Sequence, residues 1–144
     1  MQKLGNTIFI EGKMENNNDL FLKLLNGANE LSRKLLSDNG DFYPLFFYYK
    51  KDKAVSSTIY DENFSIKNVD EFLTQISKEY NVDTYVFIVN DIENSAFLVS
   101  AMLNNLNFTE MYIGYKFYNN QFVFSQELLT FDELLIWQNT ELKK

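Results

Sequence analysis

The chain contains no cysteine and no histidine among its 144 residues. Their absence removes the commonest ligands of zinc and the usual proton-transfer group at neutral pH. It also excludes the serine–histidine and cysteine–histidine pairs that activate nucleophiles in many hydrolases. Without cysteine there is no disulfide framework, and a cytoplasmic location is therefore expected. The chemistry that remains is that of carboxylates, lysine, tyrosine, serine and threonine, so we expect a protein that is not an enzyme.

Glycine and proline are scarce as well, with five residues of the first and one of the second. The glycines are scattered, and the chain contains neither GxGxxG nor GxxxxGK, so no loop that cradles a phosphate is predicted. No group of acidic residues has the spacing of a calcium-binding loop. The acidic residues at 70–71 and 132–133 are explained by the preference of carboxylates for helix N-termini. The sequence therefore indicates neither a metal nor a cofactor.

Features of membrane or nucleic-acid binding are missing too. No apolar run approaches the roughly 18 residues of a membrane span, and the opening MQKLGNTIFIEGK lacks the apolar stretch of a signal peptide. Arg33 is the only arginine, and 13 basic residues stand against 20 acidic ones, giving a net charge of −7. Duplex nucleic acid is bound largely by cations that neutralise phosphates, so we expect neither a membrane nor duplex nucleic acid as a partner. The acidity suits a basic partner, or simply keeps the protein soluble.

What the chain has in abundance is apolar residues, at 46%, and aromatic residues, at 17%. A chain of this length and composition can bury a core of its own. We expect a single globular domain over residues 1–144, in which residues 1–17 form a strand or an arm, with a strand candidate at 7–11.

Two helices and a hairpin are predicted in the first half. Apolar residues spaced by 3, 4, 3 and 4 predict a first helix, capped by Asn18 or Asp19 and stopped by the polar run 37–40. Its stripe consists of Phe21, Leu24, Ala28, Leu31 and Leu35. Residues 42–50 and 54–60 then read as a β-hairpin, whose polar second strand is expected at a sheet edge. Asn68 and Glu71 resemble a capping box for a second helix. Its stripe consists of Val69, Phe72, Leu73, Ile76 and Tyr80.

The second half is mostly strand. Strands are predicted at 84–90, 96–103, 110–118 and 121–126. Residues 96–103 have a fair helix propensity, but turn residues on both sides and the short length favour a strand. Asn119 and Asn120 accept the positive φ angles of a tight hairpin. Thr130 and Glu133 form a capping box for a closing helix at 131–139.

Strands therefore cluster as hairpins and do not alternate with helices. This order, α-β-β-α-β-β-β-β-α, predicts an α+β fold with a mainly antiparallel sheet of about five to six strands. We expect the two longer helices on one face of the sheet, together with a short C-terminal helix. The predicted core consists of Leu24, Leu31, Leu35, Phe72, Ile76, Phe87 and Val89.

One stretch carries more rings than a half-buried strand requires. In DFYPLFFYYKKDK, six of the eight residues from 42 to 49 are aromatic, so rings point to both sides of a strand. The strand at 111–118 repeats this, with a hydroxyl-rich side formed by Tyr112, Lys116 and Tyr118. Three explanations compete for the second aromatic face. It is covered by the chain's own ends, or it forms a dimer or partner interface, or it lines a pocket for a ring-bearing ligand.

The leading functional hypothesis is a small acidic binding protein without catalytic activity, which sequesters or inhibits a partner through the aromatic face. Immunity and anti-defence proteins of bacteria and phages belong to this class. The alternative is a module that binds a nucleotide-like ligand between rings, with lysines near its phosphate. A homodimer through the same face is also expected. The candidate binding residues are Tyr48, Tyr49, Lys50, Lys51, Tyr112, Lys116 and Tyr118.

Overall fold

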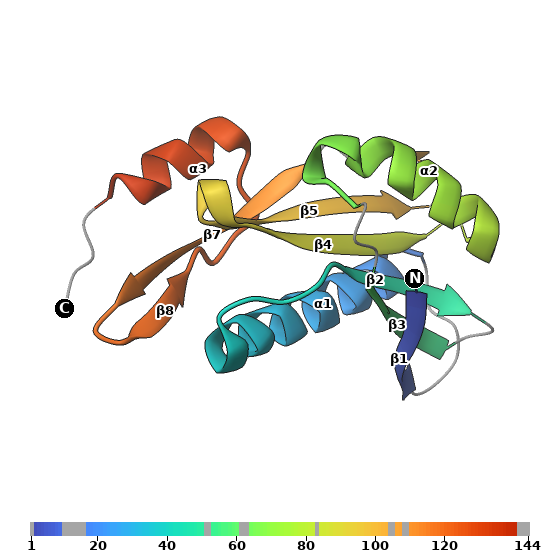
Figure 1. Ribbon diagram of the computed structural model, residues 1–144. Coiled ribbons are helices and arrows are strands. Elements are labelled where there is room, and N and C mark those ends of the chain that lie inside the picture. The colour runs from blue at the N-terminus through green and yellow to red at the C-terminus, as the bar shows by residue number, and fades with distance from the viewer. Residues whose placement is uncertain are drawn as a thin grey trace.

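A computed structural model describes residues 2–9, 17–50, 53–60, 64–82, 84–103, 106–107 and 110–140. These residues form an antiparallel sheet with helices on both faces (Figure 1). The helices are α1 (Asn17–Asn39), α2 (Val69–Tyr80) and α3 (Phe131–Gln138), with short 3-10 turns η1 (Ile66–Asn68) and η2 (Ile92–Asn94). The strands are β1 (Gln2–Phe9), β2 (Leu45–Lys50), β3 (Lys53–Ile59), β4 (Tyr85–Asp91), β5 (Ala96–Leu103), β6 (Leu106–Asn107), β7 (Met111–Tyr118) and β8 (Gln121–Phe124).

The predicted α+β class and the predicted order of elements are confirmed. The region 1–17, where a strand candidate was placed at 7–11, contains β1 at Gln2–Phe9, and the two-residue β6 was not predicted. Neighbouring strands follow the order β1-β3-β2-β4-β5-β7-β8, and β6 pairs with β5. The sheet thus has eight strands, more than the five to six expected. The strand at 54–60 was expected at an edge, which is wrong because β1 pairs with β3 along its outer side. Its serines, Ser56 and Ser57, are buried between neighbouring strands.

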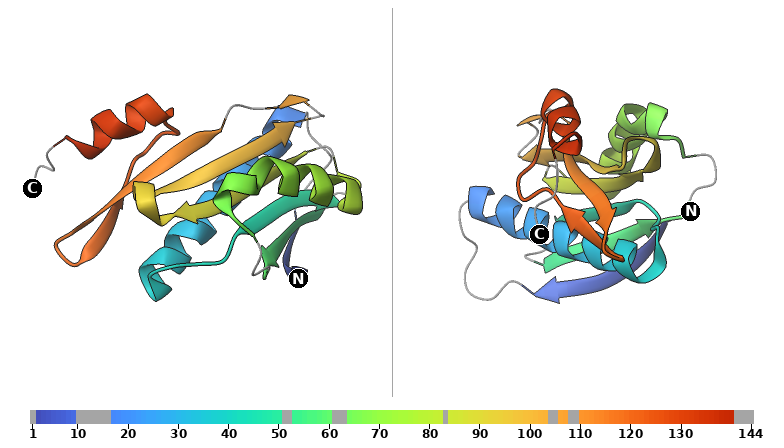
Figure 2. Two further views of the ribbon diagram at one scale, coloured as in Figure 1. Left: turned by 45° about the horizontal axis from the view of Figure 1, so that its top comes forward. Right: turned by 90° about the vertical axis from the view of Figure 1, so that its left-hand side faces the viewer.

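The two long helices lie on opposite faces of the sheet, so their predicted placement on one face is wrong (Figure 2). Helix α1 packs against Leu45 and Phe47 of β2. Helix α2 packs against Phe46, the residue between them. Because side chains alternate along a strand, contacts of neighbouring residues with two different helices place those helices on two faces.

This arrangement explains why β2 carries rings on both sides. Phe46 and Phe47 are both fully buried, one beneath α2 and the other beneath α1. A strand in the middle of a sheet that is covered on both faces needs apolar side chains at every position. The second face of β2 is therefore covered by the same chain, but by α2 from the middle of the chain and not by the chain's ends as one explanation expected.

The two buried clusters contain most of the predicted core. Leu24, Ile76, Phe87 and Val89 are buried. Leu31, Leu35 and Phe72 are half-buried and pack against the clusters from their rims. Within the described part of the chain, no helix combines the length and the hydrophobicity needed to span a bilayer.

Most of the predicted turn and capping residues at the ends of helices and strands are confirmed. Asn119 and Asn120 both have positive φ, at 51° and 62°, and close the β7–β8 hairpin. Gly40, at φ 78°, ends α1 as the polar run predicted. Thr130 and Glu133 form the predicted capping box of α3. The predicted cap at Asn68 is wrong: its side chain makes no capping hydrogen bond.

The region before α2 differs because a 3-10 turn precedes the helix. Ser65 accepts a hydrogen bond from the backbone N–H of Lys67 and so caps η1. Asn68 is the last residue of η1, and α2 follows directly after it. Asn68 is therefore already part of a helical turn and does not begin a helix after a loop. The segment 96–103, in contrast, is the strand β5 as predicted, held between β4 and β7.

Alkaline unfolding is an expected consequence of this tyrosine-rich core. Burial is the largest cause that raises the pKa of five tyrosines above the ordinary value of 10.0, since an ionised phenolate is poorly solvated there. These residues are Tyr48, Tyr80, Tyr85, Tyr112 and Tyr115. Their stabilising contribution is fully present below pH 10 and is lost as pH rises through the folded-state pKa values.

The part of the phenolate absorbance that comes from these five rings should therefore change together with the circular dichroism signal, above pH 10 and in one cooperative step. Independent ionisation of all tyrosines near pH 10, with the fold retained, would contradict the buried positions of these five rings.

Candidate functional site

The structure separates the aromatic residues of the predicted site. Tyr48 is buried beneath α2, where its ring centroid lies 5.2 Å from that of Tyr80. Burial raises the pKa of Tyr48, and the neighbouring Ser57 hydroxyl acts in the opposite direction. Tyr49 points to the other face and packs half-buried against the cluster beneath α1. Two of the predicted binding residues therefore lie on opposite sides of the sheet.

The predicted lysines at the hairpin tip remain untested. Lys51 lies outside the described residues, and so does the side chain of Lys50, the last residue of β2. The hypothesis that they meet a phosphate stays a prediction.

Tyr112 and Lys116 do share one face of the sheet, and α3 covers it. The Tyr112 ring packs against Phe131 with centroids 5.7 Å apart. The Lys116 ammonium lies 4.4 Å from the centre of the Trp137 ring and donates a hydrogen bond to the carbonyl of Thr140. Tyr118 is half-buried at the end of β7. The hydroxyl-rich side of β7 is therefore mostly a seat for the closing helix.

Helix α3 has apolar side chains on its solvent side as well as on the side that packs against the sheet. Leu134 is completely buried against β7, and Trp137 is half-buried beside it. Phe131, Leu135 and Ile136 face the solvent, and Ile136 is 71% exposed. We call these three side chains the α3 surface. The solvent side of a surface helix normally carries polar residues, so three large apolar side chains exposed there form an unusual surface.

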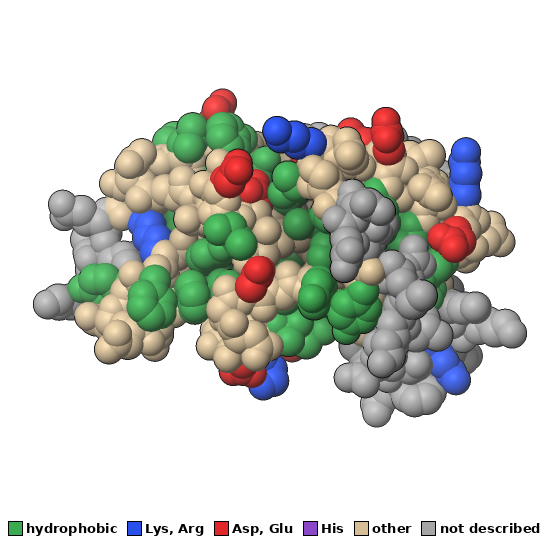
Figure 3. All heavy atoms as spheres, in the orientation of Figure 1, with side chains coloured by type: hydrophobic (Ala, Val, Ile, Leu, Met, Phe, Trp, Pro, Cys, Tyr) green, Lys and Arg blue, Asp and Glu red, His purple; other side chains and the backbone are tan. Residues whose placement is uncertain are grey.

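The surroundings of the α3 surface extend its apolar area and give it acidic borders. The amide of Gln138 donates a hydrogen bond to the carbonyl of Asn94, which joins the end of α3 to η2. In η2, Ile92 is exposed and Glu93 is exposed beside it. Asp132 is exposed in the first turn of α3. Figure 3 shows apolar side chains with acidic neighbours at the upper left, where α3 lies in Figure 1.

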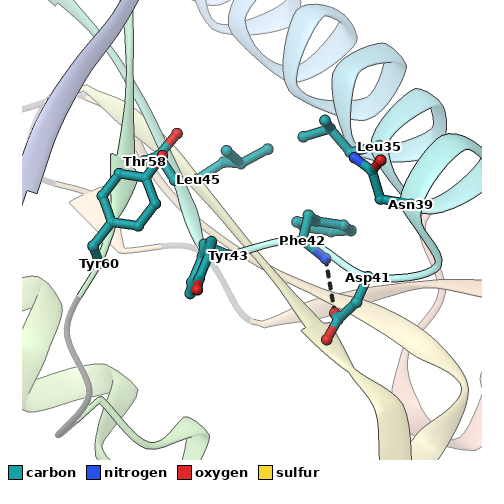
Figure 4. A pocket seen from close by; sticks show the side chains of 8 residues that line it. All are labelled: Leu35, Asn39, Asp41, Phe42, Tyr43, Leu45, Thr58 and Tyr60. Atoms are coloured by element: carbon teal, nitrogen blue, oxygen red, sulfur yellow. Dashed lines mark hydrogen bonds between the residues drawn. The ribbon is translucent and has the colours of Figure 1, made fainter.

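A hollow of about 520 Å³ lies on the opposite face of the sheet, beside the end of α1 (Figure 4). Its walls come from α1, from the link into β2, and from the paired ends of β2 and β3. We call it the aromatic hollow. It is lined by Leu35, Asn39, Asp41, Phe42, Tyr43, Leu45, Thr58 and Tyr60.

Backbone geometry positions this hollow. Gly40 reverses the chain with its positive φ, and Pro44 follows shortly and leads into β2. The carbonyl of Pro44 accepts a hydrogen bond from the N–H of Ile59, which sets the start of β2 against the end of β3. The rings of Tyr43 and Tyr60, one from each side, meet edge to face with centroids 4.9 Å apart. Tyr43 is 60% exposed, so much of this ring pair faces solvent.

Hydrogen bonds fix the one charged side chain that lines the hollow. Asp41 Oδ1 accepts the N–H of Phe42 at 2.8 Å and the side-chain amide of Asn90 at 2.7 Å. Asn90 Oδ1 in turn accepts the Tyr115 hydroxyl at 2.7 Å. Burial, followed by the charge of Asp41, raises the pKa of Tyr115. The carboxylate is thus held in place from the neighbouring strands.

A second hollow, of about 710 Å³, lies between α2 and the ends of β4 and β5. Asp70, Lys78 and Glu110 line it, so its charges are of mixed sign. Neither hollow places several lysines near rings, which is the arrangement that the nucleotide hypothesis expects. Among the described residues, no cluster of three carboxylates could hold a metal ion.

The sequence reasoning did not single out the α3 surface or the aromatic hollow. For α3, a signal was present, because residues 134–137 (LLIW) are apolar at four successive positions, more than one side of a helix can bury. For the hollow there was none, because Tyr43 and Tyr60 are brought together only by the pairing of β2 with β3. Comparison with known proteins gives no match to a family model, a curated protein or a solved structure, so both sites are interpreted from their own chemistry.

Proposed function

We propose that this protein is a non-catalytic binding protein that captures a basic protein partner on the α3 surface, as inhibitors of the immunity type do. The observation that carries this proposal is the solvent exposure of three large apolar side chains, Phe131, Leu135 and Ile136, on one short helix. Contiguous apolar side chains on a surface usually mark a place where another molecule binds. The sheet face that the sequence suggested is not available for this role, because α2 and α3 cover it.

The electrostatics favour a basic partner over a second copy of the chain. Asp132 and Glu93 border the α3 surface, and the whole chain carries a net charge of −7. In a symmetric dimer these acidic borders would face their own copies, and like charges in contact oppose association. A basic partner brings the opposite charge, which also speeds its encounter with the surface.

The surface has the composition of an interface centre. A stable interface removes roughly 800 Å² from each partner, and a few large apolar anchors supply most of its free energy. The three large side chains of the α3 surface can supply such anchors, and exposed Ile92 lies in η2, which Gln138 joins to the end of α3. Salt should therefore slow association more than it speeds dissociation, because rim charges act mainly on the encounter.

The proposal is tested with the double variant Leu135→Ser, Ile136→Ser and a matched control, Leu22→Ser. Leu22 lies on α1, on the other face of the sheet, and is 51% exposed. A partner captured from host extract and identified by cross-linking is purified, and its affinity is measured by calorimetry. We expect the double variant to bind at least 30-fold more weakly, since loss of one interface anchor costs about 2 kcal/mol or more.

The control variant should bind as the wild type does, and both variants should retain the thermal stability of the fold because the replaced side chains are exposed. Equal affinity of all three proteins would exclude the α3 surface. Light scattering tests the alternative of a homodimer. If the wild type is a dimer and the double variant is a monomer, the α3 surface binds a second copy of the chain and not a basic partner.

A further inference from the structure

We propose that the aromatic hollow binds an organic cation, namely an ammonium or guanidinium group carried on an apolar stem. The hollow is lined by residues of α1, and α1 and α3 lie on opposite faces of the sheet (Figure 2). The inference is therefore independent of the proposed function, and neither site needs the other.

The size and walls of the hollow suit a small organic group. Ligand pockets in proteins commonly have volumes of about 300–1,000 Å³ with mostly apolar walls and few polar groups. The volume of 520 Å³ is within this range. Leu35, Leu45 and Phe42 provide apolar walls, and Figure 4 shows them beside the open space between α1 and β2. An apolar stem can bury its methylene groups against them.

The charge of the lining selects a cation. Asp41 is the only charged residue among the eight that line the hollow. The nearby Lys34 on α1 already pairs with Asp38, with 2.8 Å between nitrogen and oxygen. No cationic side chain of the described residues therefore lines this space. A phosphate or a carboxylate would meet only a like charge, while a cation would meet a carboxylate.

Asp41 is prepared for this role by its hydrogen bonds. Both of them use Oδ1, so Oδ2 accepts none from the described residues. The Tyr115–Asn90–Asp41 chain of hydrogen bonds holds the carboxylate without neutralising it. A ligand that pairs with Oδ2 has no side chain to order first, which lowers the entropic cost of binding.

The rings complete the site. A cation is attracted to the face of an aromatic ring within about 6 Å of its centre, by about 0.5–2 kcal/mol. Tyr43 and Tyr60 meet edge to face, so their ring planes are inclined by 66° and present faces in different directions. Together with Phe42 they give the hollow three rings, and Asp41 lines the same hollow. Sites for alkylammonium and guanidinium groups combine these elements, since rings attract the charge and also contact the methyl or methylene groups.

The test is an NMR titration of the full chain labelled with ¹⁵N, using two pairs of probes matched in shape. Choline is compared with 3,3-dimethylbutan-1-ol, in which an uncharged carbon replaces the quaternary nitrogen. The peptide acetyl-Gly-Arg-Gly-amide is compared with the same peptide carrying citrulline. We expect at least one cation to shift the amide signals of residues 41–43 and 60, and its uncharged partner to bind at least 10-fold more weakly.

Binding of choline alone identifies a free small cation as the ligand, and binding of the arginine peptide alone identifies a basic side chain. Both results support the proposal. Equal shifts from a charged probe and its uncharged partner would overturn it, as would an absence of shifts at the hollow with all four probes.

Three variants locate the site. Asp41→Asn keeps an oxygen that can accept both hydrogen bonds but removes the charge, so cation binding should fall at least 10-fold. Tyr43→Leu removes an exposed ring and should weaken binding several-fold, whereas Tyr43→Phe keeps the ring and should bind normally. The Leu135→Ser, Ile136→Ser protein should bind the cation unchanged. Full binding by Asp41→Asn would overturn the proposal.

Discussion

Replacement of Phe87 by alanine is expected to lower the free energy of unfolding by about 3–5 kcal/mol, the usual range for removal of a large buried ring. Phe87 lies in β4 near the middle of the sheet and has no exposed surface. Its ring contacts those of Phe64 and Phe72, with centroids 5.8 and 5.5 Å away. Phe72 belongs to α2, and Phe64 belongs to the segment before this helix. The cavity left by the ring can therefore close only if α2 or that segment moves.

Urea denaturation followed by circular dichroism measures this change. The matched control is Phe117→Ala, because Phe117 is 64% exposed on β7 and packs mainly against Phe122. Its loss should cost about 1 kcal/mol or less. If the two substitutions had equal effects, the α2 face of β4 would not be the core of this fold.

Most of the correct strand predictions came from the pattern of apolar residues along each strand. The run YVFIV at 85–89 is apolar at every position, which indicates a strand covered on both faces, and β4 is such a strand. The same logic applied to residues 45–49 implied cover on both faces for β2. Taken together, the two runs required a helix on each side of the sheet. The prediction of both helices on one face was wrong because it treated the surplus rings as an exposed surface.

The position of β1 shows where sequence patterns fail. The segment KAVSSTI, now β3, is polar enough to suggest an edge, since serine and threonine tolerate water. Its serines instead lie between two neighbouring strands, and β1 supplies the outer one. Strand pairing over a separation of some fifty residues depends on the whole fold and leaves no local signal.

The two candidate sites also differ in how far the sequence predicts them. The exposed apolar residues of α3 follow directly from FDELLIWQ, because a single short helix can bury only one side against a sheet. Which side is buried depends on Gly114, whose missing side chain lets Trp137 and Leu134 approach β7. The aromatic hollow depends on register, on the turn at Gly40 and on hydrogen bonds from β4 and β7. None of these can be read from residues 41–43 alone.

Replacement of Gly114 by alanine is expected to loosen α3 and to destabilise the protein by about 1–3 kcal/mol, as overpacking of a tight contact does. An added Cβ would lie 2.7 Å from two atoms of the Trp137 ring and 2.8 Å from a methyl group of Leu134. Both contacts belong to the docked side of the helix, and Leu134 has no exposed surface. Rotation of the Trp137 ring would disturb its contact with the Lys116 ammonium, and Leu134 has no free space to enter. We therefore expect the helix to shift on β7.

The same substitution at Gly27 provides a control with the opposite expected sign. Gly27 is inside α1, and an added Cβ would meet nothing within 4 Å. Alanine there should stabilise the protein by about 0.5–1 kcal/mol, because it favours the helical backbone. Urea denaturation measures both changes. Fluorescence of Trp137, the only tryptophan of the chain, reports on the seat of α3 directly.

Gly114→Ala should shift the emission of Trp137 to longer wavelength and should also weaken capture of the partner, because the α3 surface moves with its helix. Gly27→Ala should change neither. If Gly114→Ala instead stabilised the protein as Gly27→Ala does, α3 would not rest on β7, and its apolar side chains would have no fixed arrangement to offer. Lost partner binding in Gly114→Ala together with an unchanged aromatic hollow, measured by the cation titration, would show that the two surfaces work separately.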